Sequence, residues 1–234
     1  MTIPTIAVFT HTGLLTAAEI QACVAAGQDP LHRDFAPHYG DTVLRYVAPG
    51  ELIQPDWWQC AFFDHTDQAD ALGYHDVTAS GQPLMKIFAK DAIDDGVNWN
   101  VTFWHEVHEA RADSSINKTV DAGGYQFAWE TDDACEADKW GVRVNGHLIS
   151  NSVTPAWFDP NGKPPYTIYP CAQITAPFML ASGGYIGRRQ LPNGAWSQLL
   201  AADADPRQIK RPSSRTTRRF AAADSGLSGA AGGA

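Results

Sequence analysis

The sequence predicts an α+β protein in which a mixed β-sheet packs on one long helix. Several segments alternate apolar and polar residues as strands do, whereas residues 98–113 repeat their apolar residues with the period of a helix. The 234 residues, 44% of them hydrophobic, suffice for one core of ordinary size. We expect one domain over residues 1–204 and a separate C-terminal arm over residues 205–234.

The N-terminal part predicts a strand, a helix and then further strands. Residues 5–11 alternate like a strand, and Thr16 can cap an Ala-rich helix that stops near Gly27 and Pro30. Strand-like runs follow at residues 42–48, 57–63 and 84–89. After the long helix, we expect a strand at 125–130 and hairpins at 140–150 and 183–200, which turn at Asn145-Gly146 and at Pro192-Asn193-Gly194.

The long helix has an apolar face and a face of acids and imidazole. Phe103, Trp104, Val107 and Ala110 share the first, and His105, Glu106, Glu109 and Asp113 share the second. At about 100° per residue, His105 and Glu109 lie within ~40° of each other, so both could bind one cation. Their pattern His-Glu-x-x-Glu is one substitution from the zinc-protease motif His-Glu-x-x-His.

The order of these features matches that expected of a zincin-like metallopeptidase: strands come first, then a helix with this motif, and then further acidic residues. The segments ALGYHDVTASGQPLMKIFAKDAI, HEVHEARAD, AWETDDACEAD, VNGHLISNSVTPAWFDP and ASGGYIGRR, over roughly residues 70–190, resemble an uncharacterised family of phage, prophage and bacterial proteins with a presumed zincin-like domain. The chain departs from the commonest form of that family at Trp104 and His108. The resemblance implies a zinc-dependent peptidase-like protein, some relatives of which come from phage structural-gene neighbourhoods.

The proposed metal ligands are His105 and Glu109, which offer an imidazole nitrogen and a carboxylate oxygen. The third ligand comes from Glu130, Asp133 or Glu136, with Glu130 the first choice because its separation from Glu109 is similar to that in thermolysin-like proteases. A bound Zn²⁺ would acidify a water toward pKa ~7, with Glu106 as general base. Since two carboxylates make a harder site than two imidazoles, Mn²⁺, Ca²⁺ or no metal are alternatives.

Other residues near the motif have predicted supporting roles. We expect Asp113 to orient a ligand or to end the helix, and His108 to be a surface or packed residue. Residues 70–78 or 84–89 could supply an edge strand that lies over the metal and pairs with an extended peptide or protein substrate. Tyr74 or His75 on that strand could stabilise an oxyanion.

Charge divides the chain into two parts. The net charge is -9, but residues 1–206 hold 11 basic and 25 acidic residues, whereas residues 207–234 hold six basic and one acidic. The last segment is either a solvated tail or an arm that docks on an acidic protein or a nucleic acid. The second functional hypothesis is therefore a virion component (head, connector or tail) that uses an inactive zincin-like scaffold and contacts neighbouring subunits through residues 207–234. Because the body is acidic, nucleic acid is a poor partner except through this tail.

Several classes of protein are disfavoured. Since no run of about 18 apolar residues exists and the N-terminus lacks a basic segment, we expect no membrane span and no signal peptide. We therefore expect a cytoplasmic protein when it is synthesised, with a phage virion as the alternative final location. The cysteines form no C-x-x-C pair, which argues against a thiolate zinc site and predicts buried, reduced thiols. Nucleophile-elbow, Walker and dinucleotide motifs are absent.

Overall fold

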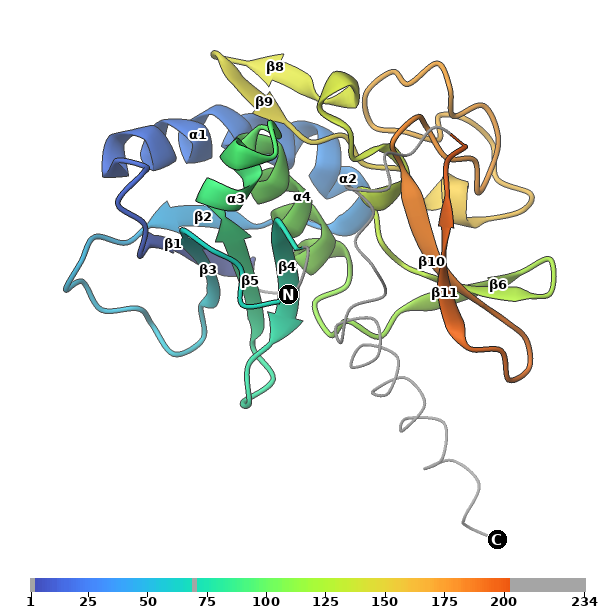
Figure 1. The fold of residues 1–234 in the computed structure, drawn as a ribbon, viewed down its shortest axis with the longest axis horizontal. Coiled ribbons are helices and arrows are strands. Elements are labelled where there is room, and N and C mark those ends of the chain that lie inside the picture. Colours follow the sequence, from blue (N-terminus) through green and yellow to red (C-terminus); the bar gives the residue numbers. More distant parts are fainter. Residues whose placement is uncertain (1–2, 69–70, 203–234) are drawn as a thin grey trace, which may run out of the picture.

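The N-terminal half of the chain forms a five-stranded sheet. A computed structural model describes residues 3–68 and 71–202. The strand order is β2-β1-β3-β5-β4, and β4 is antiparallel to β5 whereas the other neighbours run parallel. The strands are β1 (Thr5–Thr10), β2 (Val43–Tyr46), β3 (Trp58–Phe63), β4 (Gly73–Val77) and β5 (Pro83–Phe88). The predicted edge strand is therefore β4, which ends this sheet (Figure 1).

The first helix begins where the sequence predicts. In α1 (Ala17–Pro30), the Thr16 hydroxyl accepts a hydrogen bond from the Glu19 N–H, and the Glu19 carboxylate accepts one from the Thr16 N–H. The chain stays helical beyond Pro30, through η1 (Leu31–Phe35) and α2 (Ala36–Tyr39), until Gly40. Helix α1 thus ends at Pro30, as expected, but the helical stretch continues because Pro30, with φ -54°, fits a helical backbone. Gly40, with φ 91°, ends the stretch.

The long helix predicted at residues 98–113 is α4 (Trp99–Ala112), preceded by the short α3 (Ala89–Asp94). Asn98 caps α4, since its side chain accepts a hydrogen bond from the Asn100 N–H. The apolar face packs as expected: Phe103, Trp104 and Val107 are fully buried. Trp104 reaches α1 at Gly27, where an added Cβ would lie 2.0 Å from the ring, so only glycine permits this contact.

The polar face of α4 is buried as well. The helix packs against β4 and β5 and also contacts β9 (His147–Ile149), so protein covers opposite sides of it. Figure 1 shows α4 between the five-stranded sheet and the β8–β9 hairpin. The acid and imidazole side chains of α4 thus lie inside the molecule, where water cannot screen them.

The C-terminal half is built from antiparallel strands. A four-stranded sheet has the order β11-β10-β7-β6, and β8 pairs with β9 in a separate hairpin. The bounds are β6 (Thr119–Ala122), β7 (Tyr125–Ala128), β8 (Val142–Val144), β10 (Tyr185–Gln190) and β11 (Trp196–Leu200), with short helices η2 (Asp133–Cys135), η3 (Asp138–Trp140) and η4 (Pro155–Phe158) between them. A second apolar cluster around Trp157 and Phe158 packs in this half.

The mixture of helices and sheets confirms the α+β class, and both predicted hairpins are present. The four cysteines are buried and unpaired, as expected of reduced thiols. Among the described residues, no helix is long and apolar enough to cross a membrane. The predicted arm at residues 205–234 lies outside the described residues.

Candidate metal centre

Helix α4 carries three of the four predicted site residues into the interior. His105, Glu106 and Glu109 expose 4%, 0% and 1% of their surface. Because the helix repeats every 3.6 residues, its His105 and Glu109 side chains lie together: His105 Nε2 is 3.2 Å from Glu109 Oε2. The predicted pairing of imidazole and carboxylate is present in the structure.

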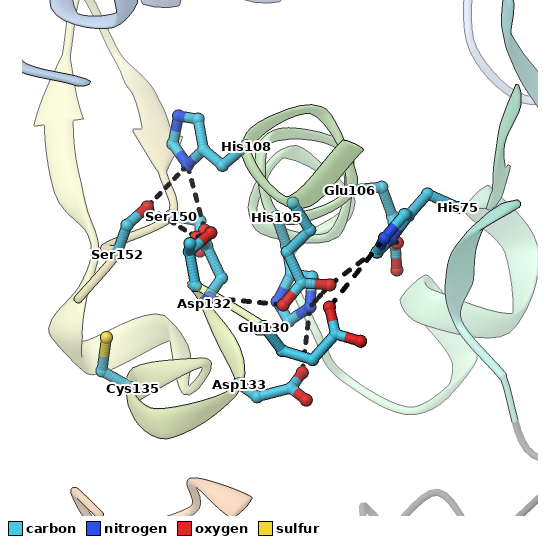
Figure 2. Close-up of polar contacts among 12 residues, drawn as sticks. His75, His105, Glu106, His108, Glu130, Asp132, Asp133, Cys135, Ser150 and Ser152 are labelled. Atoms are coloured by element: carbon cyan, nitrogen blue, oxygen red, sulfur yellow. Dashed lines mark hydrogen bonds and ion pairs between the residues drawn. The ribbon is translucent and has the colours of Figure 1, made fainter. Parts of the chain in front are cut away.

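Two segments distant in sequence complete the cluster. His75 projects from β4, Glu130 lies in the irregular segment after β7, and Asp133 is the first residue of η2. In Figure 2, His75 approaches α4 from one side, while Glu130 and Asp133 lie below His105. Six side chains from three parts of the chain therefore share one buried region: His75, His105, Glu106, Glu109, Glu130 and Asp133.

One group of three possible ligands, which we call the outer site, consists of His105, Glu109 and Asp133. His105 Nε2 lies 3.2 Å from Glu109 Oε2 and 3.3 Å from Asp133 Oδ1. A tetrahedral cation with bonds of about 2.0–2.2 Å separates its ligand atoms by about 3.3–3.6 Å. The spacing at the outer site thus fits a zinc-sized cation.

A second group, the inner site, consists of His75, Glu106 and Glu109. His75 Nδ1 lies 3.2 Å from Glu106 Oε2 and 3.5 Å from Glu109 Oε2. Its side chains are at most 1% exposed, whereas those of His105 and Asp133 in the outer site are 6% and 7% exposed. The outer site is therefore slightly less buried than the inner site.

The carboxylates dominate the electrostatics of this region. Burial alone lowers the pKa of His105, but the charges and hydrogen bonds of Glu109 and Asp133 outweigh it and hold that pKa well above its ordinary value. A positive charge is thus strongly favoured at His105. A divalent cation at the same place would meet the same negative field.

A separate polar network lies behind the cluster. His108 Nδ1 is 3.0 Å from Asp132 Oδ2, and Asp132 Oδ1 accepts hydrogen bonds from the hydroxyls of Ser152 (2.5 Å) and Thr131 (3.0 Å). The Asp132 N–H in turn donates to Glu109 Oε1 at 3.3 Å. His108 also stacks on Phe35, so it is a packed residue, one of its two predicted states. The network connects α4 to the loop that carries Glu130 and Asp133 (Figure 2).

The other predicted residues occupy several different positions. Glu130 Oε2 lies 3.9 Å from His75 Nε2, and neither group of three ligands in the described residues includes Glu130 or Glu136. Asp113 ends α4, where its carboxylate accepts a hydrogen bond from the Lys118 N–H. The Tyr74 hydroxyl donates a hydrogen bond to Asp67, and the Tyr74 ring packs against Phe88. Tyr74 therefore lies away from His75, because neighbouring residues on a strand point to opposite faces of the sheet.

Sequence reasoning missed His75 as a possible ligand and the partners of His108. The sequence feature that could have indicated His75 is its position on the predicted edge strand, next to Tyr74 and on the opposite face of that strand. Comparison of the chain with protein-family models, with curated proteins and with solved structures gives no match. The geometry of the cluster is therefore the basis on which a function can be inferred.

Proposed function

We propose that the chain is a zinc-dependent hydrolase with a zincin-like arrangement, and that peptides or proteins are its substrates. The observation that supports this most strongly is the outer site, where His105, Glu109 and Asp133 bring three ligand atoms together inside the protein. Three protein ligands are the number that catalytic zinc sites use, since a fourth position must remain for water or substrate.

The proposal takes Asp133 as the third ligand, where the sequence favoured Glu130. Asp133 Oδ1 lies 3.3 Å from His105 Nε2, a distance that a shared tetrahedral cation accounts for. Glu130 Oε2 lies 3.9 Å from His75 Nε2, and 5% of the Glu130 side chain is exposed, so we assign this residue to the wall beside the cation. The choice between these two carboxylates is testable by separate substitution.

His105, Glu109 and Asp133 would hold a divalent cation that acidifies a water and polarises a carbonyl group. Glu106 would be the general base that accepts the proton of that water. His75, 3.2 Å from Glu106 Oε2, holds this carboxylate in place. The Asp132 N–H does the same for Glu109.

The fold around the site supports a peptide-like substrate. The strand β4 runs along the edge of the sheet and carries His75 to the cluster, and an edge strand offers backbone groups to an extended peptide. A helix with His-Glu-x-x-Glu beside such an antiparallel edge strand is the arrangement that the zincin-like resemblance implies. We assign the approach of substrate to the side of His105 and Asp133, whose side chains are 6% and 7% exposed.

Two measurements on full-length protein test the proposal. Zinc content after metal loading and desalting should be lower in His105→Ala than in the wild type. It should be unchanged in His65→Ala, a matched control at an exposed histidine that pairs with Asp91. Hydrolysis of fluorescently labelled casein should occur in the wild type and be lost in Glu106→Gln, while outer-site zinc is retained. Equal zinc content in the wild type and His105→Ala would refute the proposed site. Zinc binding without casein hydrolysis would refute the peptidase assignment.

A further inference from the structure

The outer site does not use all of the cation-binding groups in the cluster. The inner site adds His75 and Glu106 and shares Glu109 with the outer one. We propose that the inner site binds a second divalent cation, so that the cluster is a two-cation centre bridged by Glu109. The inference rests on the proposed function, because it takes the outer cation as given.

The spacing of the inner site supports this proposal. His75 Nδ1 lies 3.2 Å from Glu106 Oε2 and 3.5 Å from Glu109 Oε2, close to the about 3.3–3.6 Å between ligand atoms of a tetrahedral cation. The outer site has nearly the same two distances, 3.2 and 3.3 Å. Each site therefore offers one imidazole nitrogen and two carboxylate oxygens, a mixed set that suits Zn²⁺ or Mn²⁺.

Glu109 is placed to serve both cations. Its Oε2 is the atom that approaches His75 on one side and His105 on the other. Its Oε1 accepts a hydrogen bond from the Asp132 N–H, which fixes the orientation of the carboxylate. Paired cations in hydrolases lie about 3.5–4 Å apart, a separation that a shared carboxylate group can bridge.

Charge balance also favours two cations over one. The cluster holds four carboxyl groups (Glu106, Glu109, Glu130 and Asp133) and two imidazoles. Metal-bound imidazoles are neutral, so the ionised carboxylates contribute four negative charges, which two divalent cations neutralise and one does not. All six side chains are at least nine-tenths buried, where uncompensated charge is costly.

The second cation has a consequence for the proposed hydrolysis. Once Glu106 Oε2 binds a cation, that oxygen no longer accepts a proton from water. The other oxygen of Glu106, Oε1, is then the one that remains to accept the proton.

The test is the number of cations that the full-length protein binds. Chelator-treated protein is titrated with ZnCl₂ alone, and bound zinc per chain is counted by elemental analysis and native mass spectrometry. We expect two zinc ions in the wild type and in His65→Ala, one in His75→Ala, one in His105→Ala and none in Glu109→Ala. Glu106→Gln, which keeps the size of the side chain, serves as a second inner-site variant should His75→Ala fail to fold. We expect it to bind one zinc ion.

The outcomes separate this inference from the proposed function. One zinc ion in the wild type that is lost in His105→Ala but kept in both inner-site variants overturns the second cation and leaves the hydrolase proposal standing. Loss of zinc in the inner-site variants but not in His105→Ala overturns both. An exchange-coupled electron paramagnetic resonance signal from Mn²⁺-loaded wild type, absent from both inner-site variants, would establish that the two cations are neighbours.

Discussion

The imidazole of His108 and the carboxylate of Asp132 form a buried pair, with Nδ1 and Oδ2 3.0 Å apart. The pair lies outside the two candidate cation sites, yet the backbone N–H of the same Asp132 donates to Glu109. It thus holds α4 and the loop of Glu130 and Asp133 in one fixed relation. Partners of this kind, which orient ligands without touching the metal, commonly affect metal affinity strongly.

We predict that Asp132→Asn weakens zinc binding by about 10- to 100-fold. Asparagine keeps an oxygen for Ser152 and Thr131 but presents an amide N–H₂ to His108, which opposes the existing contact. Competition with a chromophoric chelator measures the affinity. Ser150→Ala is the matched control, because Ser150 is buried nearby and its hydroxyl donates only a long hydrogen bond, 3.4 Å, to the Asn151 carbonyl. Equal affinity of Asp132→Asn and Ser150→Ala would contradict the positioning role.

A second prediction concerns Gly73 on β4. An added Cβ would lie 2.7 Å from Thr102 Cγ2 and 3.0 Å from Glu106 Cγ, so strand and helix must separate. Gly73→Ala should therefore destabilise the protein by about 1–3 kcal/mol in chemical denaturation and lower casein hydrolysis through displacement of Glu106. Gly13→Ala, at a site with open space around it, should change neither. The account fails here if both variants behave alike.

A third prediction follows from Asp138, whose carboxylate accepts a hydrogen bond from the Asn98 N–H before α4. Burial raises the pKa of Asp138 and outweighs this hydrogen bond, which lowers it. The folded state then binds more protons than the unfolded one between pH about 3.9 and the raised pKa, so this residue's contribution to the unfolding free energy increases as the pH falls through that window.

Asp138→Asn removes this titration. The variant should be more stable than the wild type at pH 7, and the difference should shrink toward zero below about pH 4. Thermal unfolding across this pH range measures it, with the exposed Asp56→Asn as control. A variant that is less stable than the wild type at pH 7 would show that the hydrogen bond matters more than burial.

A fourth prediction concerns metal removal. A cation that binds only the folded state stabilises it by about 2.7 kcal/mol at one hundred times its dissociation constant. Chelation should therefore lower the denaturation midpoint of the zinc-loaded wild type. In Glu109→Ala, which lacks the shared ligand, the chelator should leave the midpoint unchanged. A midpoint of the wild type that is indifferent to the chelator would argue against cation binding.

Much of the fold could be predicted because its signals are local. Alternating residues define β1 and β5, and the Asn145-Gly146 turn has the positive φ angles, 48° and 86°, that a tight hairpin needs. The helix α2 (Ala36–Tyr39), the helix α3 (Ala89–Asp94) and the strand β6 (Thr119–Ala122) were missed. Each is six residues or fewer, which is too short for a periodic pattern to emerge.

The candidate site likewise has a part that local sequence patterns predict and a part that they do not. His105 and Glu109 could be paired from the sequence because one helical turn joins them. The approach of His75 depends on the packing of α4 against β4, a contact that no local pattern encodes. The choice between Glu130 and Asp133 depends on the irregular backbone before η2, where periodicity gives no side-chain direction. The burial of His108 depends on Phe35 and Ser152, both distant in sequence.

The central claim is that His105, Glu109 and Asp133 share one cation. Anomalous diffraction at the zinc absorption edge, from crystals of the zinc-loaded protein, tests it most directly. The account predicts a peak about 2.0–2.2 Å from His105 Nε2, Glu109 Oε2 and Asp133 Oδ1. A zinc-loaded structure in which these atoms surround no peak, or in which the metal is held by other residues, would contradict it.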